Sequence, residues 1–160
     1  YNIIALSALK YHLLKVDPRK SMLFNPEESI DFQGNTGPFI QYTYARIQSI
    51  LKRAKMLKID FKGLNFDNVN KLSVNEKRII DLILKHRNNL KKSAETYSPS
   101  LLCNYVYDLS KTYNSFYQDE KIFDGKNNET TSFKIALSDM TSSVIKESLN
   151  TLGMDVVNKM

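Results

Sequence analysis

The sequence predicts an all-α fold, a helical bundle with one irregular segment near its N-terminus. Apolar residues recur every three or four positions through most of the chain, and no stretch shows the strict alternation of a half-buried strand. The 160 residues, 42% of them hydrophobic and 25% charged, suffice for one folded domain with a sizeable core. With only 5 glycines, the chain is poorly suited to a nucleotide-binding βαβ fold.

Two helices are predicted in the first third of the chain. Residues 2–15 form the first, which stops before Asp17 and Pro18. Its apolar residues, near helical spacing, are Ile3, Leu6, Ala8, Leu9 and Leu13. Residues 18–32 lose this periodicity and predict an irregular connection, with a short extended piece at residues 22–24.

A turn at residues 34–38 predicts the start of the second, long helix, because proline is favoured in a first helical turn. This helix is expected to reach about residue 58. Its buried stripe steps by four, three, four and three positions through Ile40, Tyr44, Ile47, Leu51 and Ala54. Residues 60–72, rich in Asn, Asp and Gly, are expected to form a loop.

Three further helical regions follow. Ser73 and Glu76 form a capping box, which opens a helix with Ile79, Leu82, Ile83 and His86 on one side. An interruption is expected at residues 88–89, within a helical region that reaches residue 97. Ser98 and Pro99 predict the start of the next helix. Its core stripe is Leu102, Val106, Leu109, Tyr113 and Phe116.

The last helix is expected over residues 129–152, after a turn at residues 124–128 that contains Gly125. Gly153 fits the left-handed position that often ends a helix. The buried residues predicted for this helix are Phe133, Leu137, Met140, Val144, Ile145, Leu149 and Leu152.

Composition excludes several kinds of site. The single cysteine, Cys103, rules out an internal disulfide framework and a cysteine-based zinc site, and is expected to be a small buried hydrophobe. Two histidines far apart in sequence, His12 and His86, leave little for a metal site or a catalytic triad. We therefore expect no catalytic residues and no metal ligands in this chain.

The chain carries a formal net charge of +6, which is compatible with nucleic acid, an anionic membrane surface or no charged partner. Its longest apolar-leaning stretch, residues 3–16, is too short and too interrupted by charge to cross a bilayer. A free thiol and the lack of an export signal favour the cytoplasm. Because the chain begins at Tyr1, we expect a piece of a longer polypeptide.

One face of the long helix after Pro38 is a candidate binding surface. Tyr42, Arg46 and Arg53, with Ser49, share a face distinct from the buried stripe. Single-stranded RNA binds to such a combination, because a ring or guanidinium plane stacks on a base and the positive charge attracts phosphate. The alternative is an ordinary exposed polar face with a half-buried tyrosine.

The tyrosines of the helix after Pro99 also allow two interpretations. They are Tyr105, Tyr107, Tyr113 and Tyr117. Each ring could be a stacking platform for a base, or it could pack in the core and leave only its hydroxyl exposed.

Several ordered motifs closely resemble those of arginyl-tRNA synthetases, which are class I enzymes. The most specific is residues 34–46 (GNTGPFIQYTYAR). The others, in the same order along the chain, are residues 8–11 (ALKY), 99–109 (PSLLCNYVYDL), 114–117 (NSFY), 149–154 (LNTLGM) and the terminal Lys159 and Met160. The resemblance covers essentially the whole chain.

This resemblance implies a C-terminal piece of such an enzyme. Residues 1–32 would be the tail of the catalytic region, and residues 33–160 the helical anticodon-binding domain of the type called DALR. The family activates arginine with ATP through two signatures, and neither signature occurs in this sequence. The parent enzyme would be an arginine-tRNA ligase that uses ATP, whereas this chain alone would bind no cofactor and be inactive.

The resemblance also implies the residues that contact the anticodon of tRNA-Arg. Where the motifs match, they are Tyr42, Arg46, Tyr117 and Met160. Arg53 and Lys134 are candidates for contacts to the RNA backbone; Lys134 stands where the family usually has arginine. Departures from the family at Lys134, Ser142, Ser148 and Phe39 concern the details of the tRNA surface and leave the domain assignment unchanged.

The partners expected are therefore tRNA-Arg for this chain, and arginine and ATP for the full enzyme. We expect no membrane association and a monomer. The competing hypothesis from a different class is a helical protein–protein interaction module that does not bind RNA. The two hypotheses differ in one geometric requirement: RNA binding needs Tyr42, Arg46, Tyr117 and Met160 on one exposed face.

Overall fold

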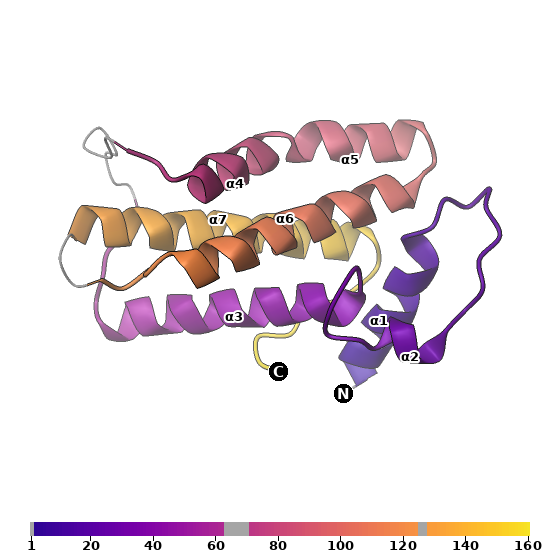
Figure 1. Cartoon of the computed structure of the whole chain (residues 1–160), viewed down its shortest axis with the longest axis horizontal. Helices are drawn as coiled ribbons and strands as arrows, with labels where there is room; N and C mark the ends of the chain where they lie inside the picture. Colours follow the sequence, from indigo (N-terminus) through magenta and orange to yellow (C-terminus); the bar gives the residue numbers. More distant parts are fainter. Residues whose placement is uncertain (1, 63–70, 125–127) are drawn as a thin grey trace.

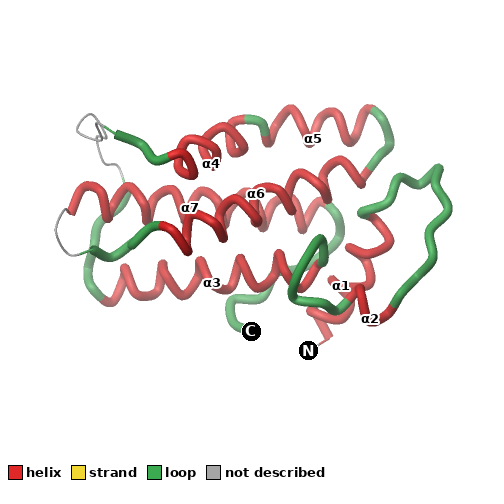
Figure 2. Tube along the Cα trace, in the orientation of Figure 1, coloured by secondary structure: helices red, strands yellow, loops and turns green. Residues whose placement is uncertain are grey.

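The computed structural model describes residues 2–62, 71–124 and 128–160, and these form seven helices and no strand (Figures 1 and 2). The predicted all-α class is confirmed. The helices are α1 (Asn2–Leu14), α2 (Pro26–Ser29), α3 (Gly37–Met56), α4 (Val74–Leu84), α5 (His86–Glu95), α6 (Pro99–Asp119) and α7 (Asn128–Thr151).

Three long helices, α3, α6 and α7, lie side by side and contact one another (Figure 1). Helices α4 and α5 form a second layer: α4 packs on α6 and α7, and α5 packs on α6. Helix α1 crosses the beginning of α3 at one end of the bundle, and the short α2 lies against α1. The C-terminal tail leaves α7 and returns toward α3 (Figure 1).

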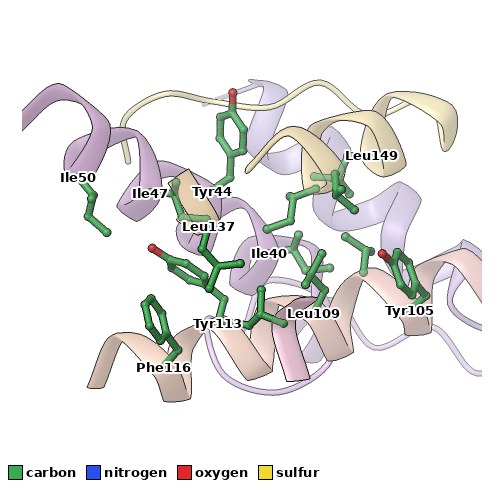
Figure 3. Packing of buried hydrophobic residues seen from close by; sticks show 14 of the residues in the cluster. Ile40, Tyr44, Ile47, Ile50, Tyr105, Leu109, Tyr113, Phe116, Leu137 and Leu149 are labelled. Atoms are coloured by element: carbon green, nitrogen blue, oxygen red, sulfur yellow. The ribbon is translucent and has the colours of Figure 1, made fainter. Parts of the chain in front are cut away.

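The core lies between α3, α6 and α7 (Figure 3). The stripe predicted for α6 is buried throughout, and that predicted for α3 is buried except for Leu51, which is partly exposed. The Tyr113 hydroxyl donates to Ser138 Oγ at 2.8 Å, so this tyrosine belongs to the core. Cys103 is buried as predicted, and its burial raises the pKa of the thiol to about 12, which leaves it unreactive.

The predicted helix ends are largely confirmed. Ser73 and Glu76 form the capping box at α4, with Glu76 N donating to Ser73 Oγ at 3.2 Å and Ser73 N donating to Glu76 Oε2 at 2.7 Å. Gly153, two residues after the end of α7, adopts φ +73, as the left-handed position requires. Helix α6 begins at Pro99 with Ser98 at the N-cap position, as predicted, but the Ser98 side chain makes no capping hydrogen bond and its Oγ instead lies 2.9 Å from Ser100 Oγ.

The buried face of α1 differs from the prediction. Its buried residues are Ser7, Ala8, Tyr11 and His12, whereas Ile3, Leu6, Leu9 and Leu13 are exposed. The reason is a close crossing at Gly37, where an added Cβ would lie 2.9 Å from the Ser7 carbonyl oxygen. Such an approach needs small residues at the contact, so the leucines lie on the opposite side of α1.

Three smaller expectations are also wrong. The irregular segment contains the short helix α2, which Asn25 caps. The helical region that begins at the Ser73 capping box breaks at Lys85, between α4 and α5, rather than at residues 88–89. Met140 is exposed, because α7 faces α3, α6 and α4 with other residues.

Two predicted loops fall partly outside the described residues, at 63–70 and 125–127. In the described part of the chain, no helix is both long and apolar enough to cross a membrane.

Candidate functional site

One face of α3 borders a hollow of about 600 Å³ that lies between α3, the end of α6 and the C-terminal tail. This volume is in the range of small-ligand sites. Helix α3 contributes Tyr42, Ala45, Arg46, Ser49, Ile50 and Arg53. The remaining lining residues are Tyr117, Glu120, Lys121, Ile122, Phe123, Lys159 and Met160.

A guanidinium between two rings dominates the hollow. The Arg46 Cζ lies 4.8 Å from the centre of the Tyr42 ring and 4.6 Å from the centre of the Tyr117 ring. Both distances are within cation–π range. Tyr42 and Tyr117 remain 44% and 41% exposed, so part of each ring is available to another molecule.

Asn114 holds Arg46 in place from α6. Its Oδ1 accepts a hydrogen bond from Arg46 Nη1, and its Nδ2 donates to Thr43 Oγ1 at 2.8 Å. Thr43 Oγ1 in turn donates to the Phe39 carbonyl at 2.9 Å. The guanidinium is therefore oriented before any ligand arrives, which reduces the entropy lost on binding.

A second guanidinium lies further along α3. The Arg53 Cζ lies 4.5 Å from the centre of the Phe123 ring, which follows α6. Arg46 and Arg53 are seven residues apart, or roughly 10.5 Å along the helix axis. The hollow thus has two guanidinium–aromatic pairs, one toward each end of its α3 wall.

The charge of the hollow is mainly positive. Among the residues that the structure describes, the cationic side chains of the hollow are Arg46, Arg53, Lys121 and Lys159, and its one acidic side chain is Glu120. Lys134 Nζ donates to Glu120 Oε2 at 2.8 Å, and this hydrogen bond is the main reason that the pKa of Glu120 is lowered. Because Lys134 neutralises this carboxylate, the arginines and lysines determine the field toward an anion.

The structure brings together the four residues expected to contact the anticodon. Tyr42, Arg46, Tyr117 and Met160 all line the hollow, and Arg53 lines it with them. Lys134 does not: it is buried, and its ammonium is engaged by Glu120 and the Lys121 carbonyl. The candidate interface therefore excludes Lys134, which acts on the hollow only through Glu120.

Sequence reasoning missed several residues that line or support the hollow. Phe123 and Lys121 follow α6 in a segment without helical periodicity, so no spacing pattern related them to α3. Asn114 lies in the NSFY motif, but its contact with Arg46 depends on how α6 packs against α3. Of the other tyrosines of α6, Tyr105 and Tyr113 have buried rings and Tyr107 packs against Phe39, as the alternative interpretation predicted. The hydroxyls of Tyr105 and Tyr113 are not left exposed, however, since they donate to the Leu82 carbonyl and to Ser138 Oγ.

The part of the chain that the structure describes contains no group of three or more His, Cys, Asp or Glu arranged to hold a metal ion. The side chains that line the hollow can instead stack on a ligand through their aromatic rings, donate hydrogen bonds from their guanidinium groups and attract anions. A planar, partly apolar and anionic ligand fits these properties, and a nucleotide in a single strand has all three.

Comparison with known proteins agrees with this chemistry. A family model described as the DALR anticodon binding domain matches residues 40–160. The chain is 48% identical over 164 residues to the arginine–tRNA ligase of Flavobacterium psychrophilum, and 44% identical over 161 residues to that of Parabacteroides distasonis. These alignments cover 100% and 99% of the chain but 26% of each relative, so the chain spans about a quarter of their length.

Solved structures show the same fold. An arginyl-tRNA synthetase of Thermus thermophilus superimposes with a TM-score of 0.86 at 22% identity, over 99% of this chain and 27% of that one. The arginyl-tRNA synthetase of Plasmodium falciparum gives a TM-score of 0.80 at 28% identity, with 99% and 27% coverage. At 22% identity, the first similarity supports the fold alone.

Proposed function

Since this chain belongs to the DALR anticodon-binding domain family, we propose that it binds the anticodon loop of an arginine tRNA. The observation that carries the proposal is the convergence of Tyr42, Arg46, Tyr117 and Met160 on one hollow. These residues come from α3, α6 and the tail, and the resemblance in sequence implies the same four without any knowledge of their positions.

Recognition would use an unstacked base. A base entering the hollow meets the exposed parts of the Tyr42 and Tyr117 rings, and stacking on such a ring contributes about 1–3 kcal/mol per base. Arg46 presents donors to the base edge, since its hydrogen bond to Asn114 uses Nη1 and a guanidinium carries five N–H donors. Met160 supplies an apolar contact on the wall of the hollow.

The phosphates would meet the cationic side chains around the hollow. Arg53, Lys121 and Lys159 all line it, and they come from three different segments of the chain. Contacts of this kind position the strand without reading its sequence, and they weaken as salt is added.

The parent protein would be an arginine-tRNA ligase. Its ligation of arginine to tRNA uses ATP, and both small molecules would bind outside this chain, because the two signatures of arginine activation are absent here. This chain alone would be inactive. We further propose a cytoplasmic enzyme that acts as a monomer, in which residues 1–32 belong to the catalytic region and residues 33–160 to the anticodon-binding domain.

The exposed apolar face of α1 supports a larger parent protein. Ile3, Leu6, Leu9 and Leu13 form a continuous apolar stripe, and such stripes are normally covered in a folded protein. We expect the part of the catalytic region that lies outside this chain to cover it. The competing hypothesis, a helical interaction module without RNA binding, is not favoured, because it gives no role to the guanidinium between two rings.

The test is the binding of this chain to an anticodon stem-loop. A fluorescently labelled stem-loop with an arginine anticodon is titrated with protein at about 50 mM and about 200 mM salt. The control is the same stem with an anticodon for another amino acid. We expect tighter binding to the arginine anticodon at both salt concentrations. Equal affinity for the two loops would contradict anticodon recognition.

A further inference from the structure

Gln41 is completely buried, with 0% of its surface exposed, although its neighbour Tyr42 lies open to the hollow. Its Nε2 donates to the Asp155 carbonyl at 2.6 Å and to Ser7 Oγ at 3.0 Å. Its Oε1 accepts from the Val157 backbone N–H at 3.1 Å. One side chain of α3 therefore bonds to both α1 and the C-terminal tail.

The two bonds to the tail run in opposite directions. The Gln41 amide donates to one backbone group and accepts from another two residues later, as a neighbouring peptide group does in a β-ladder. Because a buried amide without partners is unfavourable, leaving either bond unmade would destabilise this arrangement. The amide thus specifies one position for residues 155–157.

Other contacts hold the tail before this point. Gly153 turns the chain after α7, Lys10 Nζ donates to the Gly153 carbonyl, and Met154 is buried. After Val157, three residues remain, and the last two line the hollow. Gln41 therefore anchors the tail from within the core, immediately before the segment that carries Lys159 and Met160.

We propose that Gln41 is a positioning residue for base recognition. It contacts no ligand; it holds the tail so that Met160 and Lys159 form one wall of the hollow. Tyr42, the next residue along α3, lines the same hollow, so of two adjacent residues one contributes to the site and the other holds the tail that completes it. This inference rests on the proposed function, since it assigns the tail a part in RNA binding.

The test uses the whole chain with ¹³C-labelled methionine methyl groups, in which Met160 is assigned by deleting it. Gln41→Leu removes all three hydrogen bonds from within the core. Val157→Pro removes one of them from the tail and leaves the core unchanged, and Val157→Ala keeps the N–H as its matched control. Thermal unfolding of each variant shows whether it folds.

We expect the Met160 methyl signal to move to the position of an unstructured methionine in Gln41→Leu and Val157→Pro, but not in Val157→Ala. Affinity for the arginine anticodon stem-loop should fall in both variants by at least the factor seen on deletion of Met160, because Lys159 moves away with the tail. Combining Val157→Pro with that deletion should cause no loss beyond that of Val157→Pro alone.

Three results would overturn the inference. The first is an unchanged Met160 signal in Val157→Pro. The second is a displaced signal with unchanged RNA affinity, and the third is a combined loss equal to the product of the separate losses. If the unaltered chain binds no RNA, the proposed function fails and the role in recognition fails with it. The Met160 signal still decides separately whether Gln41 holds the tail.

Discussion

Replacing Tyr117 by alanine removes one of the two rings that enclose Arg46. If a base stacks on this ring, its removal should cost about 1–3 kcal/mol of binding, which is roughly a 5- to 150-fold loss of affinity. The protein itself should change little. Tyr117 is partly exposed, an exposed cation–π contact contributes about 0.5–1 kcal/mol, and Tyr42 still lies 4.8 Å from Arg46.

The assay is fluorescence anisotropy with the arginine anticodon stem-loop, repeated over a series of salt concentrations. Because the substitution removes no charge, the affinity should fall by the same factor at every salt concentration. Tyr117→Phe keeps the ring face and should bind nearly as well as the unaltered chain. Tyr97→Ala removes a tyrosine that is 87% exposed and outside the hollow, so it should have no effect.

The reasoning is refuted if Tyr117→Ala binds as well as Tyr97→Ala. It is also refuted if the loss appears only at low salt, because that pattern would indicate a changed charge distribution rather than a missing stacking surface. Denaturant unfolding of both variants separates a loss of binding from a loss of folded protein.

Three further predictions concern charge, packing and pH. Arg53→Gln should weaken RNA binding and reduce the slope of log affinity against log salt by about 0.7 for each phosphate that the variant no longer neutralises. The control is Lys52→Gln, a residue that does not line the hollow and whose replacement should leave the slope unchanged. Equal slopes in the two variants and the unaltered chain would contradict a phosphate contact by Arg53. Gly37→Ala should lower the free energy of unfolding, measured by urea denaturation, by about 1 kcal/mol or more, because the new Cβ would lie 2.9 Å from the Ser7 carbonyl oxygen. Replacing glycine by alanine inside a helix usually has the opposite effect. An increase in the free energy of unfolding would therefore show that α1 moves away at little cost. Lys134→Gln should lower the free energy of unfolding by about 1–3 kcal/mol at neutral pH. Since Lys134 lowers the pKa of Glu120, the pair stabilises the fold at pH values above the ordinary pKa of a glutamate, and this stabilisation is lost as the pH falls and Glu120 is protonated. The difference in unfolding free energy between Lys134→Gln and the unaltered chain should therefore become smaller in acid. A difference that does not depend on pH would contradict this explanation.

Helical periodicity predicted α3, α6 and α7 well because it is a local property. A stripe at spacings of three and four faces one side of a helix whatever that helix packs against. The same reasoning was wrong for α1. Several of its faces carry apolar residues, and the close approach of Gly37 to Ser7 and Ala8 decided which face is buried.

The tyrosines of α6 show where spacing stops being informative. Tyr113 and Tyr117 are four residues apart and share a face, so helical spacing alone does not separate them, although only Tyr113 belongs to the predicted buried stripe. In the structure, Tyr113 is buried against α7 and its hydroxyl donates to Ser138 Oγ, whereas Tyr117 lies near the end of α6 and its ring contacts the Arg46 guanidinium. The position of each residue relative to the neighbouring helices made one a core residue and the other part of the site.

The sequence by itself determined the helical class, most of the helix boundaries, the pairing of Tyr42 with Arg46 on one face and, through its motifs, the family. These properties depend on residues close together in the chain or on a motif read in order. Tertiary structure alone decided that Tyr117, Phe123 and Met160 meet Arg46 and Arg53 around one hollow, and that Lys134 turns away to Glu120. The physical reason is that contacts between distant segments depend on how helices pack and where the tail is anchored, and no spacing along one helix records either.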